Sequence, residues 1–159
     1  MSLLETMISL AILLVALIGI MGLASLSMTT TENEGHLMAR RTEYAQDKLE
    51  QLNSLAFGDA QTDTTVFPAV SSGGTGLAIG GSSDPTSTVT GYVDYLDVNG
   101  NLTTSTTQWY YIRTWKIETP PGTTNLKQIT VTAMVRPGAA NARGPAIQST
   151  VIALKTSPF

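Results

Sequence analysis

The sequence lacks cysteine altogether and contains a single histidine, His36. Without cysteine the chain cannot form a disulfide or a thiolate metal site, and a cysteine nucleophile is excluded. No motif places a serine, an aspartate or a second histidine beside His36, so we interpret it as a solvated helix residue rather than a catalytic or metal-binding one. Phosphate loops, dinucleotide fingerprints and zinc motifs do not occur. We therefore expect no enzyme activity and no cofactor.

Charge is also scarce, at 13% of residues against 42% hydrophobic ones. Nine Lys and Arg stand against twelve Asp and Glu, which gives a net charge of −3. Such a balance argues against a nucleic-acid partner, because binding to phosphates needs a basic surface. The few charges are unevenly distributed: from Met1 to Thr31 the only ionisable side chain is that of Glu5. The average composition therefore hides a strongly apolar N-terminus.

The apolar stretch from Met7 to Met28 carries no charge. As a helix it would extend about 33 Å, enough to cross a hydrocarbon core of roughly 30 Å. A cleaved signal peptide would need a basic segment before a shorter apolar run of about 7–15 residues. No Lys or Arg precedes this run, so we expect residues 1–28 to form a transmembrane or filament-core helix.

The helical pattern continues through residues 29–57, where apolar residues recur at helical spacing with charged residues between them. These apolar positions are Met38, Ala45, Leu49, Leu52 and Ala56. Residues 2–57 would then form one helix of about 80 Å, since no proline occurs before Pro68. Glycine lowers helix stability by about 1 kcal/mol relative to alanine. Gly19 and Gly22 are thus the expected points of kinking or melting.

The remaining residues predict a head of β-structure. Residues 58–88 are rich in Gly, Ser and Thr and are expected to form a loop that covers the head. In residues 89–159, β-branched and aromatic runs separated by turn signals predict four antiparallel strands. In 126–135 one face carries Ile129, Val131, Ala133 and Val135. The predicted fold class is α+β, with the amphipathic half of the helix packed on the sheet.

Glu5 is the residue that most requires an explanation. A carboxylate deep in a bilayer costs about 2.5–3.5 kcal/mol and normally has a partner. One interpretation is a helix N-terminal acid that favours the macrodipole and stays among lipid headgroups. The other is an ion pair with a cation of another subunit, for which the nearest candidate is the α-amine of Met1.

The N-terminal sequence MSLLETMISLAILLVALIGI resembles the mature N-terminus of type IV pilins and pseudopilins, with glutamate at the fifth position before an uninterrupted apolar helix. The segment YAQDKLEQLNSL resembles the amphipathic half of the same helix, and YYIRTWKIETPP with LKQITVTAMV resembles paired strands of the pilin head. The resemblance implies the pilin fold. It also implies a basic leader removed by a prepilin peptidase, N-methylation of Met1, and Met1 with Glu5 as the assembly pair. Family members more often begin with Phe, and many have a proline near Gly22.

The resemblance implies a structural subunit of a type IV pilus-like filament that is stored in the inner membrane and assembles outside the cell with copies of itself. An inner-membrane assembly platform is a further implied partner. Similarity in YAQDKLEQL and RTWKIE also fits a minor pilin or a type II secretion pseudopilin, which primes or drives a short periplasmic filament. A single-pass anchored binding domain without a polymer is a third interpretation.

Three weaker patterns lie in the head. Oxygen-bearing side chains recur with part of the spacing of a calcium loop, although a hairpin turn at Asn99-Gly100 explains them better: Asp94, Asp97, Asn99 and Asn101. Sites for attached sugars are conceivable but rank below a plain polar surface: Asn101, Thr103, Thr104 and Ser105. An aromatic cluster is interpreted first as strand packing and second as a carbohydrate- or surface-binding patch: Trp109, Tyr110, Tyr111 and Trp115.

Overall fold

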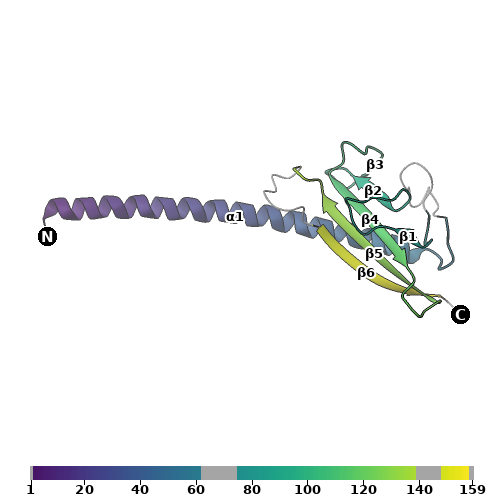
Figure 1. Cartoon of the computed structure of the whole chain (residues 1–159). Helices are drawn as coiled ribbons and strands as arrows, with labels where there is room; N and C mark the ends of the chain where they lie inside the picture. The colour runs from purple at the N-terminus through teal and green to yellow at the C-terminus, as the bar shows by residue number, and fades with distance from the viewer. Residues whose placement is uncertain (1, 62–74, 139–147, 158–159) are drawn as a thin grey trace. The chain divides into compact units, whose positions relative to one another are not determined.

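The computed structural model describes residues 2–61, 75–138 and 148–157. The chain divides into two compact units, an N-terminal helix unit that ends at His36 and a head that begins at Leu37. One helix contributes to both units, and all strands belong to the head (Figure 1). In chain order the elements are α1 (Leu3–Ser54), β1 (Gly80–Gly81), β2 (Val93–Leu96), β3 (Leu102–Thr103), β4 (Tyr111–Glu118), β5 (Leu126–Val135) and β6 (Gln148–Thr156).

The predicted long helix is confirmed as a continuous α-helix over Leu3–Ser54. Its polar residues do not interrupt it, because their hydroxyl groups bond to backbone carbonyls of the preceding turn. Thr31 Oγ1 donates to the Ser27 carbonyl at 2.9 Å, and Thr29 Oγ1 donates to the Leu26 carbonyl at 3.0 Å. Such bonds give each hydroxyl a partner within the helix. The apolar and threonine-rich segments thus form a single helix.

The sheet is antiparallel, with strand order β3-β2-β4-β5-β6, and β1 pairs with β4 away from this path. The α+β prediction is confirmed, whereas the prediction of four strands is wrong, because the described residues already form a sheet of six strands. The two additional strands, β1 and β3, are only two residues long and carry no alternating pattern that could reveal them. One of them, β1, lies inside the segment 58–88 that was expected to be loop.

Two predicted boundaries also differ from the structure. The helix ends at Ser54 rather than near Phe57, and a turn follows in which Asp59 N–H donates to the Ala56 carbonyl. The first long strand begins at Val93 rather than Val89, because Tyr92 N–H donates back to the Val89 carbonyl and Gly91 has a positive φ of 86°. A turn of this kind takes residues 89–92 out of the extended conformation.

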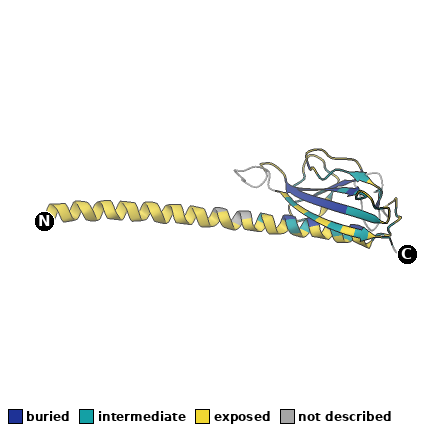
Figure 2. Ribbon diagram, turned by 60° about the horizontal axis from the view of Figure 1, so that its bottom comes forward, coloured by how far each residue is buried: buried dark blue, intermediate teal, exposed yellow. Residues whose placement is uncertain are grey.

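The head has one main hydrophobic core between α1 and the sheet. The predicted face of β5 is confirmed: Ile129, Val131 and Ala133 are fully buried there with Ala45 and Leu52 of the helix. Figure 2 shows this buried region at the centre of the sheet. The opposite face of β5 is less polar than expected, since Met134 is buried in a second cluster.

The helix face that packs on the sheet differs partly from the sequence prediction. Met38 and Ala56 were expected on it, but Met38 is 51% exposed and Ala56 is exposed as well. The helix instead buries the charged side chains of Arg41 and Lys48. A hydrophobic pattern could not reveal this, because charged residues are rarely buried without partners.

Lysines from the sheet donate to one backbone carbonyl in the last turn of α1 and to two carbonyls outside the helix. Lys155 Nζ donates to the Asn53 carbonyl, and Lys127 Nζ donates to the carbonyls of Phe57 and Leu77 at 2.7 Å each. Carbonyls at this end have no partner within the helix, and cations are favourable there. Ser54 Oγ also donates to the Gln51 carbonyl at 2.8 Å, so the end of the helix is held by strands β5 and β6 together with its own last turn.

Candidate functional site

The N-terminal part of α1 is apolar and uncovered. Residues Leu3–Thr29 are long and apolar enough to cross a membrane, and none of their most apolar stretch is buried. Every large apolar side chain from Leu3 to Met28 is at least half exposed. Figure 2 colours this N-terminal part of α1 as exposed. A helix that is hydrophobic on all sides requires lipid or protein around it. A membrane anchor meets this requirement, and a signal sequence has the same length and composition.

Glu5 lies in the first turn of this helix and is exposed. The Ser2 carbonyl begins the helix by accepting from Glu5 N–H at 3.0 Å and from Thr6 N–H at 3.3 Å. Ser2 and Glu5 also have the spacing of a capping box, Ser-x-x-Glu, which the sequence analysis missed. Among the described residues no side-chain bond of Glu5 is formed, so its carboxylate stays available to an external cation. The predicted partner, Met1, lies outside the described residues.

Gly19 and Gly22 lie within the unbroken helix. A Cβ atom added to either would meet nothing within 4 Å, so neither glycine is required by contacts inside the chain. Both residues leave space on the helix surface for another molecule to approach closely. Melting at these positions is absent from the isolated chain, and the prediction for an assembled filament stays a prediction.

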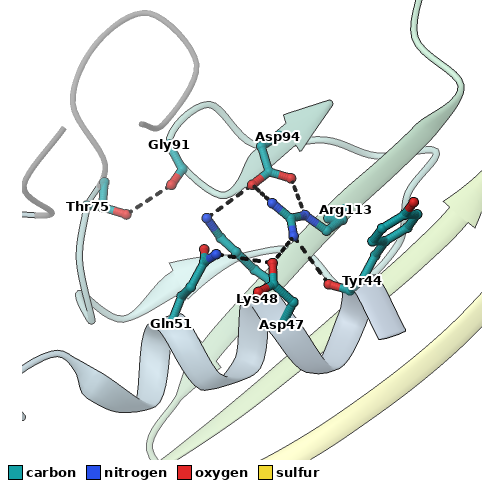
Figure 3. A network of polar contacts seen from close by, with 8 residues as sticks. All are labelled: Tyr44, Asp47, Lys48, Gln51, Thr75, Gly91, Asp94 and Arg113. Carbon is teal, nitrogen blue, oxygen red and sulfur yellow. Dashed lines mark hydrogen bonds and ion pairs between the residues drawn. The ribbon is translucent and has the colours of Figure 1, made fainter. Parts of the chain in front are cut away.

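A charge cluster lies between α1 and the sheet and is formed by Asp47, Lys48, Asp94 and Arg113 (Figure 3). Arg113 binds both carboxylate oxygens of the fully buried Asp94, at 2.7 and 2.9 Å. Lys48 Nζ lies 3.1 Å from the same carboxylate, and Arg113 Nη1 lies 3.0 Å from Asp47 on the helix surface. The cluster joins α1, β2 and β4.

The cluster contains two positive and two negative side chains. Burial and these neighbouring charges shift the pKa values of Asp94 and Lys48. Burial acts to raise the pKa of Asp94, but Arg113 and Lys48 outweigh burial and hold that pKa below its ordinary value. Burial lowers the pKa of Lys48, and attraction to Asp94 offsets this only in part. Two cations around one buried carboxylate are compatible with a stable fold because Asp47 supplies a second negative charge. The arrangement anchors the helix on the sheet.

The four calcium candidates do not form one site. Asp94 is engaged by Arg113 and Lys48, whereas Asp97 accepts bonds from the backbone N–H groups of Asn99 and Asn101 at 2.8 and 2.9 Å. These bonds shape the turn between β2 and β3, so the predicted hairpin is confirmed. Hydrogen bonds from Asn101 lower the pKa of Asp97. Within the described residues no three His, Asp or Glu side chains come together as metal ligands.

The four glycosylation candidates lie in that turn and directly after it. Asn101 is exposed, but its side-chain amide donates to Asp97 at 3.1 Å. Thr103 and Ser105 are half-buried, and their hydroxyl oxygens accept backbone bonds from Ser105 and Gln108. Thr104 is exposed. Of the three hydroxyl-bearing candidates, Thr104 is therefore the most accessible.

The predicted aromatic cluster divides into two parts. Tyr111 and Trp115 are 2% exposed and lie on the helix-facing side of β4, which confirms the packing interpretation for these two. Trp109 and Tyr110, before β4, are half-buried at the end of the sheet. His36 is exposed on α1.

No protein-family model, curated protein or solved structure matches this chain.

Proposed function

We propose that the chain is a structural subunit of a type IV pilus-like filament that assembles through its N-terminal helix. One observation carries the proposal: a predominantly apolar, exposed helical segment of 27 residues is joined to a folded head and contains one acid in its first turn. Before assembly the helix is stored in the inner membrane. In the filament it is covered by copies of itself, and the head lies outside the cell.

Glu5 sets the axial register of this assembly. A carboxylate in an apolar helix bundle is destabilising unless a cation lies beside it. The α-amine of Met1 in a neighbouring copy supplies that cation, so a misaligned neighbour leaves both charges unpaired. The resemblance of the sequence to type IV pilins assigns a prepilin peptidase and an assembly platform of the inner membrane as partners. No catalytic step is attributed to the chain itself.

The test replaces Glu5 by alanine in the organism that encodes the protein. We expect the Glu5→Ala chain to remain in the membrane fraction while sheared filaments, counted by electron microscopy, fall at least tenfold. Glu32→Ala is the matched control, because Glu32 is an exposed acid on the same helix outside the apolar segment. Normal filament numbers from Glu5→Ala would contradict the proposal.

A minor pilin or a type II secretion pseudopilin is the second candidate, favoured by the similarity of the amphipathic segment. The two functions differ in copy number. Quantitative mass spectrometry of sheared filaments should find this chain as the main component if it is the structural subunit, and as a trace component if it primes the filament. The same spectra should show an N-terminal peptide that begins at Met1 and carries one additional methyl group.

A further inference from the structure

A groove lies at the end of the sheet where β4 begins and β5 ends. Its volume is about 620 Å³, within the roughly 300–1,000 Å³ that is usual for sites of small ligands. Three segments of the head line it: the turn after β2, the residues before β4 and the residues after β5. We call it the end groove, and its lining includes Asp97, Val98, Gln108, Trp109, Tyr110 and Arg136.

The aromatic rings of the end groove are held in place by the rest of the head. Trp109 packs against a buried cluster of β2, β4 and β5, and its ring centre lies 5.8 Å from that of Tyr95 and 5.7 Å from the guanidinium carbon of Arg136. Tyr110 makes an edge contact with Tyr111 at 4.8 Å between ring centres. The Tyr110 N–H donates to the last carbonyl of β2, and the Tyr110 carbonyl accepts from Arg136 N–H. A ligand therefore meets rings that are already ordered, which lowers the entropy cost of binding.

Polar groups of the end groove keep hydrogen-bonding capacity that the head does not use. Arg136 Nη1 donates to the Thr107 carbonyl at 2.7 Å. Within the described residues, Nε and Nη2 of Arg136 and the side-chain amide of Gln108 form no hydrogen bond. Asp97 Oδ2 accepts one hydrogen bond, from the Asn101 amide at 3.1 Å. The groove thus offers several donors and a carboxylate acceptor beside its aromatic rings.

The charges of the end groove favour a neutral ligand. Asp97 stays ionised because hydrogen bonds from Asn101 lower its pKa, and Arg136 supplies one positive charge. The lining is therefore neutral overall, so an anionic ligand gains little net attraction. An apolar ligand would cover the donors of Arg136 and Gln108 without giving them partners, which costs free energy.

A neutral sugar ring meets each of these requirements. One face of a pyranose consists of C–H groups, which pack on the negative face of an aromatic ring such as that of Trp109. Its hydroxyls both donate and accept, so they can pair with the carboxylate of Asp97 and with the donors of Gln108 and Arg136.

We propose that the end groove binds a neutral pyranose sugar. Of the predicted aromatic cluster, only Trp109 and Tyr110 then take part, because Tyr111 and Trp115 are buried. The sugar site gives the head a binding role that goes beyond the proposed filament and does not depend on assembly.

The two tryptophans permit a direct test, because Trp109 lines the groove while Trp115 is buried in the core. We would solubilise the full chain in a detergent without a sugar headgroup and follow tryptophan fluorescence. The neutral probes are the methyl glycosides of glucose, galactose, mannose and N-acetylglucosamine, and the anionic probe is the methyl glycoside of glucuronic acid. We expect a saturable change with at least one neutral probe and weaker binding of the anionic probe than of the best neutral one.

Variants locate the binding. The side chain of Gln108 is exposed and unbonded within the described residues, so Gln108→Ala should keep the fold. Loss of one hydrogen bond should raise the Kd of the best sugar about threefold to tenfold. Gln148→Ala, an exposed glutamine on β6 outside the groove, is the matched control and should leave the Kd unchanged. Trp109→Phe should remove the fluorescence response, because Trp115 lies outside the groove.

The outcomes bear on this site alone. The absence of a saturable response to all four neutral probes would overturn the proposal, and tighter binding of the glucuronide would overturn the choice of a neutral ligand. An unchanged Kd in Gln108→Ala, or an equal rise in Gln148→Ala, would place the binding outside the end groove. Because the titration uses unassembled chain, its failure leaves the filament proposal standing, and a failure of Glu5→Ala to reduce filaments leaves the sugar site standing.

Discussion

At the scale of single residues, Asp94 determines how α1 is held on the sheet. Its carboxylate is fully buried and receives Arg113 from β4 and Lys48 from α1. Arg113 also donates to the Tyr44 carbonyl of the helix at 3.3 Å. Because each charge needs the others, the helix cannot shift along the sheet without leaving a buried ion unpaired. The cluster therefore contributes to the position of the helix more than to overall stability.

Replacing Asp94 by asparagine tests this role. The variant keeps the shape of the side chain but leaves Arg113 and Lys48 buried with no charged partner except the surface carboxylate of Asp47. We expect the free energy of unfolding to fall by about 3–5 kcal/mol. The measurement is urea unfolding of the detergent-solubilised chain followed by tryptophan fluorescence, since both tryptophans lie in the head. Glu50→Gln, an exposed acid on α1, should change stability by no more than about 0.5 kcal/mol.

The unfolding free energy of Asp94→Asn should also depend on pH differently from that of the wild type. The pKa of Asp94 is lower in the folded chain than in the unfolded chain, where it is about 3.9. Its stabilisation is therefore complete above that value and is lost as pH falls towards the folded pKa. The difference in unfolding free energy between the wild type and Asp94→Asn should shrink below about pH 4. A difference that stays constant from pH 6 to pH 2 would contradict this role of the carboxylate.

At the scale of elements, the short strand β1 depends on a glycine. Gly81 has φ of 84°, and a Cβ atom there would overlap the Trp115 carbonyl and lie 2.7 Å from the Tyr92 ring. We expect Gly81→Ala to lower the free energy of unfolding by more than about 2 kcal/mol, from backbone strain and steric overlap together. Gly122→Ala is the control, because Gly122 has φ of 78° but nothing within 4 Å. Equal losses in both variants, measured by urea unfolding, would exclude the steric contribution.

The elements also show what could be predicted from the sequence. The long helix, the β2–β3 hairpin and the inner face of β5 follow from local patterns and are confirmed. Strand β1 could not be predicted, since a Gly-Gly pair becomes a strand only by pairing with Ile117 and Lys116. The burial of Lys48 could not be predicted either, because its partner Asp94 is far away in the sequence. Contacts of long sequence separation leave no local periodicity.

At the scale of the whole molecule, the two units differ in charge. The N-terminal helix unit carries three acids, Glu5, Glu32 and Glu34, and neither Lys nor Arg. The head therefore contains nine acidic and nine basic residues and is neutral overall. Neutral heads repel one another little, which favours close packing of copies. The distribution supports an assembly in which an apolar helix gathers the copies and the heads pack beside one another.

This division predicts that the two units can be separated. A chain that begins at Leu37 keeps the part of α1 that packs on the sheet, including Ala45 and Leu52, and loses the uncovered apolar helix. We expect it to be a folded monomer in buffer without detergent, whereas the full chain should require detergent or sediment with phospholipid vesicles, because its exposed apolar side chains need a covering. Circular dichroism, size-exclusion chromatography and vesicle sedimentation would measure these differences. A full chain that stays monomeric in buffer and does not bind vesicles would contradict the membrane-spanning role of Leu3–Thr29, and an unfolded truncated chain would contradict the independence of the head.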